Sequence, residues 1–416
     1  MLQALRAAAV VGLSILAAAL LVGVSPFDRA SAGLKRLFAA GPDWTQVNSF
    51  YRDVHTQEVS KGEQPRDGLA KLAQFWRTIP DSKRVVLVGN SQTLSTILAP
   101  GEPPIGTPEK TYPDFLSEHY RKVSNGRVQF YRLAAPNISY MEALWYLHYL
   151  VIHPDLKPDV VVLQLNYESL RKSGIRDGML TLLEDEEFAK VIEQIAGGNQ
   201  AFSGVFGQAM ERWLAMRRQR EAAEANSSST KTGVQSAEGF GNRLENAVRK
   251  RVSRLPGLDQ RHELKYSVVN FLYLARVYFL NLKPTTARSL GGATLAVSRA
   301  SVEEIAAECQ KNRIRLVILN AAQNPNAVLY KSSDDKRLYD EVIARVVNRF
   351  AVPFYDFEHS IPAALWGVWI DGPDPIHFGR NAHRRMADLL IESRAIDAAL
   401  GKDSPPAVRA QQEKKM

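Results

Sequence analysis

The most regular pattern in this 416-residue chain is a series of short apolar runs, rich in valine, leucine and isoleucine and bounded by turn-forming residues. Such runs predict buried strands. Four are clear and a fifth is weaker, over residues 85–88, 128–133, 160–165, 316–319 and 352–355. Helical patterns alternate with them, over residues 112–122, 140–151, 302–312, 340–349 and 380–394. This alternation predicts a three-layer α/β/α fold with a mostly parallel sheet.

Residues 171–299 break the alternation, because the strand pattern disappears there and the composition becomes helical and charged. We interpret this stretch as a helical insertion into an α/β domain formed by residues 80–170 and 300–400. Residues 222–241 contain an Asn-Ser-Ser-Ser-Thr run and few large apolar side chains, which predicts a flexible loop. Residues 266–282 are strongly apolar but flanked and interrupted by basic residues. A core or membrane-surface helix is expected there, not a second membrane span.

The two ends of the chain have a different character. Residues 7–24 form a charge-free apolar run, which is typical of an export segment. At about 1.5 Å per residue it spans roughly 27 Å, enough for a thin bilayer. An Ala-Ser-Ala sequence at residues 30–32 is an alternative cleavage site, which would release a secreted protein. We favour an uncleaved anchor within residues 1–32, with the rest of the chain in the periplasm or outside a bacterial cell. Residues 33–79 are expected to form a helical lead-in, and residues 401–416 a disordered tail.

Charge and cysteine content narrow the classes of partner and cofactor. The net charge of +9 comes in short basic clusters without an aromatic RNA-binding signature, so nucleic acid is not the expected partner. The charge indicates either an anionic surface or polymer, or a solvated basic face with no specific partner. Cys309 is the only cysteine, which excludes an intramolecular disulfide and a multi-cysteine metal site. The histidines lack metal-binding spacing, and we expect no metal or organic cofactor.

Candidate chemistry begins where the first strand ends. The sequence Gly89-Asn90-Ser91-Gln92 follows that strand and precedes a helix-like stretch from about Thr93. Ser91 would therefore lie at the carboxyl edge of the sheet, where ligands of open α/β folds usually bind. Backbone N–H groups at this junction could also stabilise an oxyanion. A simpler alternative is that Ser91 only caps the helix, because serine favours that position.

A nucleophilic serine needs a base, and the base needs a carboxylate that orients it. An Asp-x-x-His sequence can supply both, since residues three apart on a helical turn face the same way. The spacing occurs three times, as Asp259/His262, Asp356/His359 and Asp374/His377. The first pair lies in the charged insertion and is interpreted as a chance match. The second directly follows the last strand and stays open as an alternative. We favour the third, which occupies a loop rich in proline and glycine before the final helix.

Two short sequences of this chain, the one around Ser91 and the one from Asp374 to His377, resemble conserved blocks of the SGNH, or GDSL, hydrolase superfamily. Gly89-Asn90-Ser91 is similar to the family's opening Gly-Asp/Asn-Ser block after the first strand. The sequence from Asp374 to His377 is similar to its closing Asp-x-x-His block before the last helix. The resemblance covers about half of the chain, roughly the two stretches assigned to the α/β domain.

The two inner blocks match less well. The family's third block, Gly-x-Asn at the end of a central strand, is matched by Asn166, but Gln164 stands in place of the glycine. Its second block offers a glycine N–H to the oxyanion, and residues 134–139 contain no glycine. Asn137 is the candidate substitute there, because backbone donation needs no particular side chain. Capping of loops is the alternative role for both asparagines.

The resemblance implies a serine esterase or O-acyltransferase with Ser91, Asp374 and His377 as its triad. The oxyanion hole would be formed by Ser91, Asn137 and Asn166. The layout is also similar to bacterial membrane-anchored proteins of alginate O-acetylation and teichoic-acid D-alanylation. That similarity implies acyl esters of a cell-surface or exported polysaccharide as substrate, and a membrane acyltransferase as a candidate partner. The alternative is a non-catalytic polysaccharide-binding or assembly protein with a degenerate SGNH fold, which the missing glycines favour.

Overall fold

The computed structural model describes residues 65–77, 80–94, 110–135, 137–198, 200–229, 287–327, 329–369 and 372–401, all of them within the unit Thr45–Met416. Several sequence predictions lie outside these ranges: the anchor in residues 1–32, the apolar segment 266–282, the Asp259/His262 pair and the tail beyond Gly401. Helix α4 (Pro65–Arg77) is the described part of the expected lead-in. Within the described ranges, no helix has the length and apolar character needed to cross a membrane.

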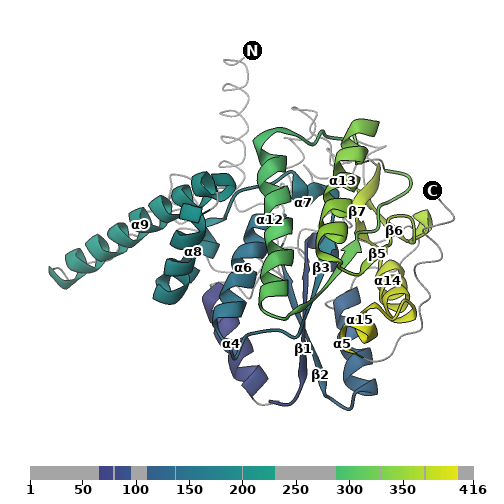
Figure 1. Cartoon of the computed structure of the whole chain (residues 1–416), viewed down its shortest axis with the longest axis horizontal. Helices are drawn as coiled ribbons and strands as arrows, with labels where there is room; N and C mark the ends of the chain where they lie inside the picture. Colours follow the sequence, from purple (N-terminus) through teal and green to yellow (C-terminus); the bar gives the residue numbers. More distant parts are fainter. Residues whose placement is uncertain are drawn as a thin grey trace, which may run out of the picture. The chain divides into compact units, whose positions relative to one another are not determined.

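Five parallel strands form the central sheet, in the spatial order β2-β1-β3-β4-β5 (Figure 1). They are β1 (Lys83–Gly89), β2 (Val128–Ala134), β3 (Val160–Leu165), β4 (Arg315–Asn320) and β5 (Phe354–Asp356). The five predicted strands are confirmed, with ends shifted by no more than a few residues. The chain leaves β1 for β2 on one side and returns to β3 on the other. The carboxyl ends of β1 and β3 therefore flank the switch point at which open α/β sheets bind ligands.

The central strands are apolar on both faces because both faces are covered. In β1, Val85 and Leu87 belong to one buried cluster and Val86 and Val88 to the other. Successive side chains of a strand point to opposite faces, so one continuous apolar run supplies two cores. The prediction of a mostly parallel sheet between helical layers is thereby confirmed.

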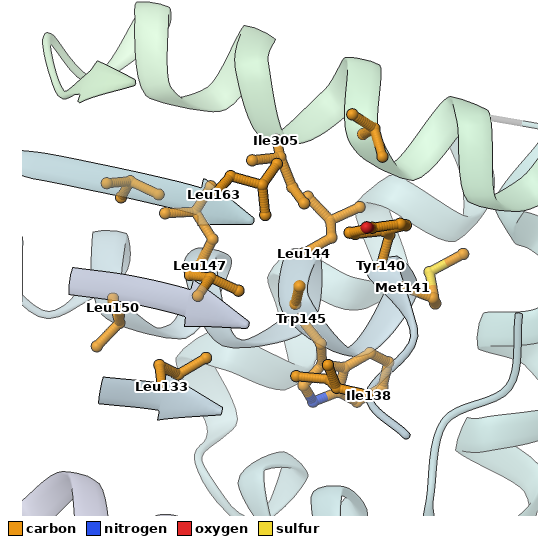
Figure 2. Packing of buried hydrophobic residues seen from close by; sticks show 14 of the residues in the cluster. Leu133, Ile138, Tyr140, Met141, Leu144, Trp145, Leu147, Leu150, Leu163 and Ile305 are labelled. Carbon is orange, nitrogen blue, oxygen red and sulfur yellow. The ribbon is translucent and has the colours of Figure 1, made fainter. Parts of the chain in front are cut away.

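Helices pack on both faces of the sheet (Figure 1). One layer contains α4, α6 (Tyr140–Ile152), α12 (Gly292–Lys311) and α13 (Ser333–Phe350). The other contains α5 (Tyr112–Val123), α14 (Arg380–Glu392) and α15 (Ala395–Ala399). Figure 2 shows Leu144 and Leu147 of α6 beside Leu163 of β3, with Ile305 of α12 across from them. The predicted helices are present, and α12 and α13 begin earlier than expected, at Gly292 and Ser333.

The described part of residues 171–299 is helical. It follows α7 (Tyr167–Leu170) and contains η2 (Asp177–Glu184), α8 (Glu186–Gly198) and α9 (Gln200–Ser229). Trp145 of α6 makes edge-on ring contacts with Phe188 of α8 and Phe206 of α9, so the insertion buries the outer side of α6. The flexible loop expected over residues 222–241 needs correction at its start, because α9 continues to Ser229. The alanines, glutamates and arginines before that point are strong helix formers.

Candidate active site

A tight turn at the end of β1 places Ser91 at the carboxyl edge of the sheet. Asn90 is the N-cap of the short helix η1 (Ser91–Thr93), and its side chain accepts the N–H of Gln92 at 3.0 Å. The Thr93 hydroxyl donates to the Asn90 carbonyl at 2.7 Å. Asn90, rather than Ser91, is therefore the capping residue, and Ser91 is left half-buried at the first position of the turn.

Gly89 is required by close packing beneath this turn. A Cβ atom at Gly89 would lie 2.2 Å from Cγ2 of Thr93 and 2.9 Å from Oε1 of Gln164. No larger side chain fits there without moving the turn that carries Ser91.

Ser91, His377 and Asp374 form a continuous chain of hydrogen bonds. Nε2 of His377 lies 2.9 Å from Oγ of Ser91, and Nδ1 lies 3.0 Å from both carboxylate oxygens of Asp374. Asp374 is 2% exposed, and its Oδ1 also accepts the backbone N–H groups of Ile376 and His377, each at 2.7 Å. These hydrogen bonds offset the cost of burying the carboxylate.

This arrangement assigns the histidine tautomer. An ionised carboxylate can only accept, so Nδ1 of His377 carries the proton that Asp374 receives. Nε2 is then an acceptor for the hydroxyl proton of Ser91. A serine beside an unprotonated imidazole nitrogen, whose other nitrogen is held by a carboxylate, can act as a nucleophile by general-base catalysis.

The segment that carries His377 is a strand and not the irregular loop expected from its prolines and glycines. Strand β7 (Gly372–Phe378) pairs antiparallel with β6 (Trp366–Trp369), with an irregular register. Phe378 packs edge-on against Trp366 at a ring distance of 4.9 Å, and the Gly379 N–H donates to the Leu365 carbonyl at 2.9 Å. Proline is tolerated in such a two-stranded edge, because not every backbone N–H is needed for pairing.

The alternative pair, Asp356/His359, is not assembled in the same way. Oδ1 of Asp356 accepts the side-chain amide of Asn320 at 2.9 Å and the N–H of Glu358 at 3.0 Å. His359 is exposed, and no hydrogen bond between described residues joins it to Asp356.

Asn166 has the capping role that was considered for it. It caps α7, with Oδ1 accepting the N–H of Ser169 at 2.9 Å, and its own N–H donates to the Tyr140 hydroxyl at 2.7 Å. Nδ2 of Asn166 donates to no other described residue. The side chain lines a small cavity with Gln92 and Ile376, between the ends of the strands and the histidine segment. An amide whose oxygen is fixed and whose nitrogen is available suits an oxyanion donor.

Asn137 lies just beyond β2, whose last residue Ala134 pairs with Gly89 of β1. Its φ of 58° is in the left-handed region, which asparagine tolerates better than most residues. Glycine adopts this conformation without strain, so the backbone at Asn137 suits the place for which a glycine was expected. Its Oδ1 accepts from Nζ of Lys172 at 2.6 Å, and burial lowers the pKa of Lys172 to about 8.

Two buried amides near the triad were missed by sequence reasoning. Gln92 donates to the carbonyl of Ile376 at 2.8 Å, and Asn324 donates to the carbonyl of Asp374 at 2.8 Å. The position of Gln92 next to Ser91 was a signal in the sequence. Asn324 lies 50 residues from its partner and had none.

The single cysteine of the chain lies in helix α12. Burial raises the pKa of the Cys309 thiol in α12, so the thiolate is disfavoured. In the part of the chain that the structure describes, no three His, Cys, Asp or Glu side chains are grouped as metal ligands would be.

Comparison with known proteins gives similar structures but no family. No family model matches the chain, and no curated protein matches it. A psychrotrophic esterase from a Pseudoalteromonas species is 8% identical, with a TM-score of 0.36 over 77% of this chain and 100% of its own. An acetylxylan esterase from Geobacillus stearothermophilus is 10% identical, with a TM-score of 0.35 over 76% and 95%. An alpha/beta hydrolase from the metagenome of Lake Arreo, Spain, is 14% identical, with a TM-score of 0.34 over 77% and 97%. Similarity at these scores shows neither the family nor the activity of this chain.

Proposed function

We propose that this protein is an SGNH-type serine hydrolase that cleaves or transfers acyl esters. Ser91 is the nucleophile, His377 the general base and Asp374 the carboxylate that orients it. The observation that carries the proposal is the hydrogen-bond chain from Asp374 through His377 to Oγ of Ser91. Ser91 and His377 are 286 residues apart in the sequence and meet at the carboxyl edge of β1, which makes a chance contact of three matched groups a poor explanation.

The reaction follows from the protonation states of these groups. Oγ of Ser91 attacks the ester carbonyl carbon while its proton passes to Nε2 of His377. The C–O bond of the tetrahedral intermediate then breaks, and the leaving alcohol takes the proton from Nε2. Water or a sugar hydroxyl attacks the acyl-serine by the same steps in reverse. Nδ2 of Asn166 and the backbone N–H groups of Ser91 and Asn137 would stabilise the oxyanion, at about 3 kcal/mol for each donor.

The substrate class rests on properties of the whole chain. The net charge of +9 favours an anionic polymer or surface, and the apolar run in residues 7–24 would hold the enzyme at a bacterial membrane, outside the cytoplasm. We therefore place the ester on a cell-surface or exported polysaccharide. A membrane acyltransferase would be the source of the acyl group if the enzyme transfers rather than hydrolyses.

The first experiment is labelling of the full-length protein with an active-serine phosphonate probe. Wild-type protein should be labelled, and Ser91→Ala should not. Ser332→Ala is the matched control, because Ser332 caps α13 through a bond to the Asp335 N–H and its loss costs about 1 kcal/mol without touching the site. Labelling that persists in Ser91→Ala would assign another nucleophile. Wild-type protein that is folded but unlabelled would favour the non-catalytic alternative.

The second experiment separates transfer from hydrolysis. The lifetime of the acyl-enzyme is measured with and without anionic polysaccharides, on the full chain and on a chain lacking residues 1–32. Deacylation that accelerates with a polymeric hydroxyl acceptor supports transfer. Rapid hydrolysis that is indifferent to the acceptor and to residues 1–32 leaves a plain esterase.

A further inference from the structure

A buried glutamine links the nucleophile to the base through a second route. Gln92 is 1% exposed, and its Nε2 donates to the carbonyls of Ile376 at 2.8 Å and Ala322 at 2.9 Å. Gln92 directly follows Ser91, and Ile376 directly precedes His377. One side chain therefore fixes the distance between the two backbone segments that carry the reacting groups.

The orientation of this amide is set by its surroundings. Nε2 faces two carbonyl oxygens, which only accept, so Oε1 must face the other way. Oε1 of Gln92 accepts from Nε2 of Gln164, which lies on β3 and is 1% exposed. Gln164 occupies the position at which the resembling family has glycine. The substitution that weakened the sequence resemblance therefore supplies a donor that fixes the amide of Gln92.

A third amide holds the other end of the same segment. Nδ2 of Asn324, beyond β4, donates to the carbonyl of Asp374, while its Oδ1 accepts the N–H of Asn326 at 3.0 Å. Asn324 is also buried. The segment from Asp374 to Ile376 is thus fixed at both ends by side chains from the turns that follow β1 and β4. Among the described strands, β7 itself pairs only with the short strand β6.

We propose that Gln92 is a positioning residue that holds His377 in register with Ser91, and that Gln164 supports it. The inference rests on the proposed function, since it assumes that His377 is the base. The amide of Gln92 is bonded to two backbone carbonyls and to Gln164, and it acts on His377 through the backbone at Ile376. A displacement of the base by about 1 Å is expected to cost about 100-fold in rate.

The test is Gln92→Met, which keeps the side-chain length and removes both donated hydrogen bonds and the one accepted from Gln164. The matched control is Gln129→Met, because Gln129 is also buried and donates to a backbone carbonyl, that of Gly126 at 2.7 Å, at the opposite edge of the sheet. Turnover of a small activated ester is measured on the full chain. We expect Gln92→Met to lower kcat about 100-fold with little change in KM, and Gln129→Met to leave both within about twofold.

A double variant with His377→Ala shows whether Gln92 positions the base or only supports the fold. In a His377→Ala background there is no base left to misplace, so Gln92→Met should cause no further loss of the residual rate. Losses that multiply would overturn the inference, as would equal activities of Gln92→Met and Gln129→Met. Either result leaves the proposed function intact if wild-type protein is labelled by the phosphonate and Ser91→Ala is not. A wild-type protein without labelling refutes the proposed function instead.

A second variant covers the outcome in which Gln92→Met does not fold. Gln164→Met leaves both carbonyls bonded to Gln92 and removes only the donor that fixes its orientation. We expect a smaller loss of kcat, about 3- to 10-fold, with the same lack of effect in the His377→Ala background. Unchanged kcat in Gln164→Met would overturn the supporting role of Gln164.

Discussion

The segments 356–359 and 374–377 have the same Asp-x-x-His spacing and begin with the same local structure. In each, Oδ1 of the aspartate accepts the backbone N–H two residues later, from Glu358 in one segment and Ile376 in the other. Such bonds are typical of Asx turns. Both turns lie near the carboxyl edge of the sheet. This shared bond therefore does not distinguish them.

The histidines differ because the chain beyond them differs. After His377, the buried Phe378 packs against Trp366 and α14 begins, which turns the imidazole toward Asp374 and Ser91. The residue directly after His359 is the half-buried Ser360, and the next buried side chain is that of Ile361. His359 itself is exposed, while Asp356 is bonded to Asn320. A spacing motif can thus supply the aspartate turn, but packing that follows the motif determines where its histidine points.

The largest expected effect is that of removing each histidine. His377→Ala should lower the chemical step by about four orders of magnitude or more, as loss of a triad base does. His359→Ala should change kcat/KM by less than about twofold, because the side chain is exposed and has no hydrogen bond to Asp356 among the described residues. Ester hydrolysis by the two variants checks the comparison directly. The opposite ranking would assign the base to the 356–359 segment.

Substitution of Asp374 should lower activity, whereas substitution of Asp356 should lower mainly stability. Asp374→Asn can present an amide N–H to Nδ1 of His377, which favours the tautomer with the proton on Nε2, and that nitrogen then cannot accept from Ser91. A loss of about 10³- to 10⁴-fold in kcat is expected.

Asp356→Asn should leave kcat within a few-fold. It replaces an ionised acceptor of the Asn320 amide by a neutral one, so the free energy of unfolding should fall by about 1 kcal/mol. Kinetics and urea unfolding are measured on both aspartate variants. A 1000-fold loss of kcat in Asp356→Asn would contradict the distinction between the segments.

Substitutions of Asn166 test the side of the cavity that lies opposite the 374–377 segment. Asn166→Ala removes a cap and a proposed oxyanion donor, so kcat should fall about 100-fold or more and stability by about 1 kcal/mol. Asn166→Asp keeps an N-cap oxygen for the Ser169 N–H but has no amide to donate. We expect it to restore the stability and not the rate. Recovery of the rate together with the stability would leave capping as the only role of Asn166.

The smallest expected effect on activity is that of His148, a histidine near the carboxylate of Glu308 to which we assign no catalytic role. His148 of α6 is 3% exposed, with Nδ1 4.0 Å from Oε1 of Glu308, and Lys311 is also nearby. Burial lowers the pKa of His148 to about 4. Since the unfolded chain takes up the proton near pH 6.5, this term lowers stability as the pH falls from about 6.5 to 4, by an amount on the order of 3 kcal/mol.

His148→Leu should remove that part of the pH dependence and leave ester turnover near neutral pH unchanged. Urea unfolding of wild type and variant at about pH 7.5 and 4.5 measures the difference. Parallel losses of stability in the two proteins would show that His148 does not contribute to the acid response.

The secondary structure of the described chain was largely determined by local sequence. A short apolar run such as that of β1, rich in valine and bounded by turn formers, predicts a strand covered on both faces, and this signal needs no distant residue. The same holds for the helix caps and for the Asx turn at Asp374. Where local reasoning failed, the competing signals were also local: strong helix formers extend α9, and pairing with β6 makes a strand of a segment rich in proline.

Only the tertiary structure decided which Asp-x-x-His segment meets Ser91 and what holds it there. That contact joins residues 286 positions apart, and the Gln92–Gln164 bond joins residues 72 apart. Such pairs depend on strand order and on the packing after each motif, which spacing within one segment does not encode. The glutamine at position 164 shows the limit most clearly. In the sequence it is a departure from a family pattern, and in the fold it is a buried donor to the residue beside the nucleophile.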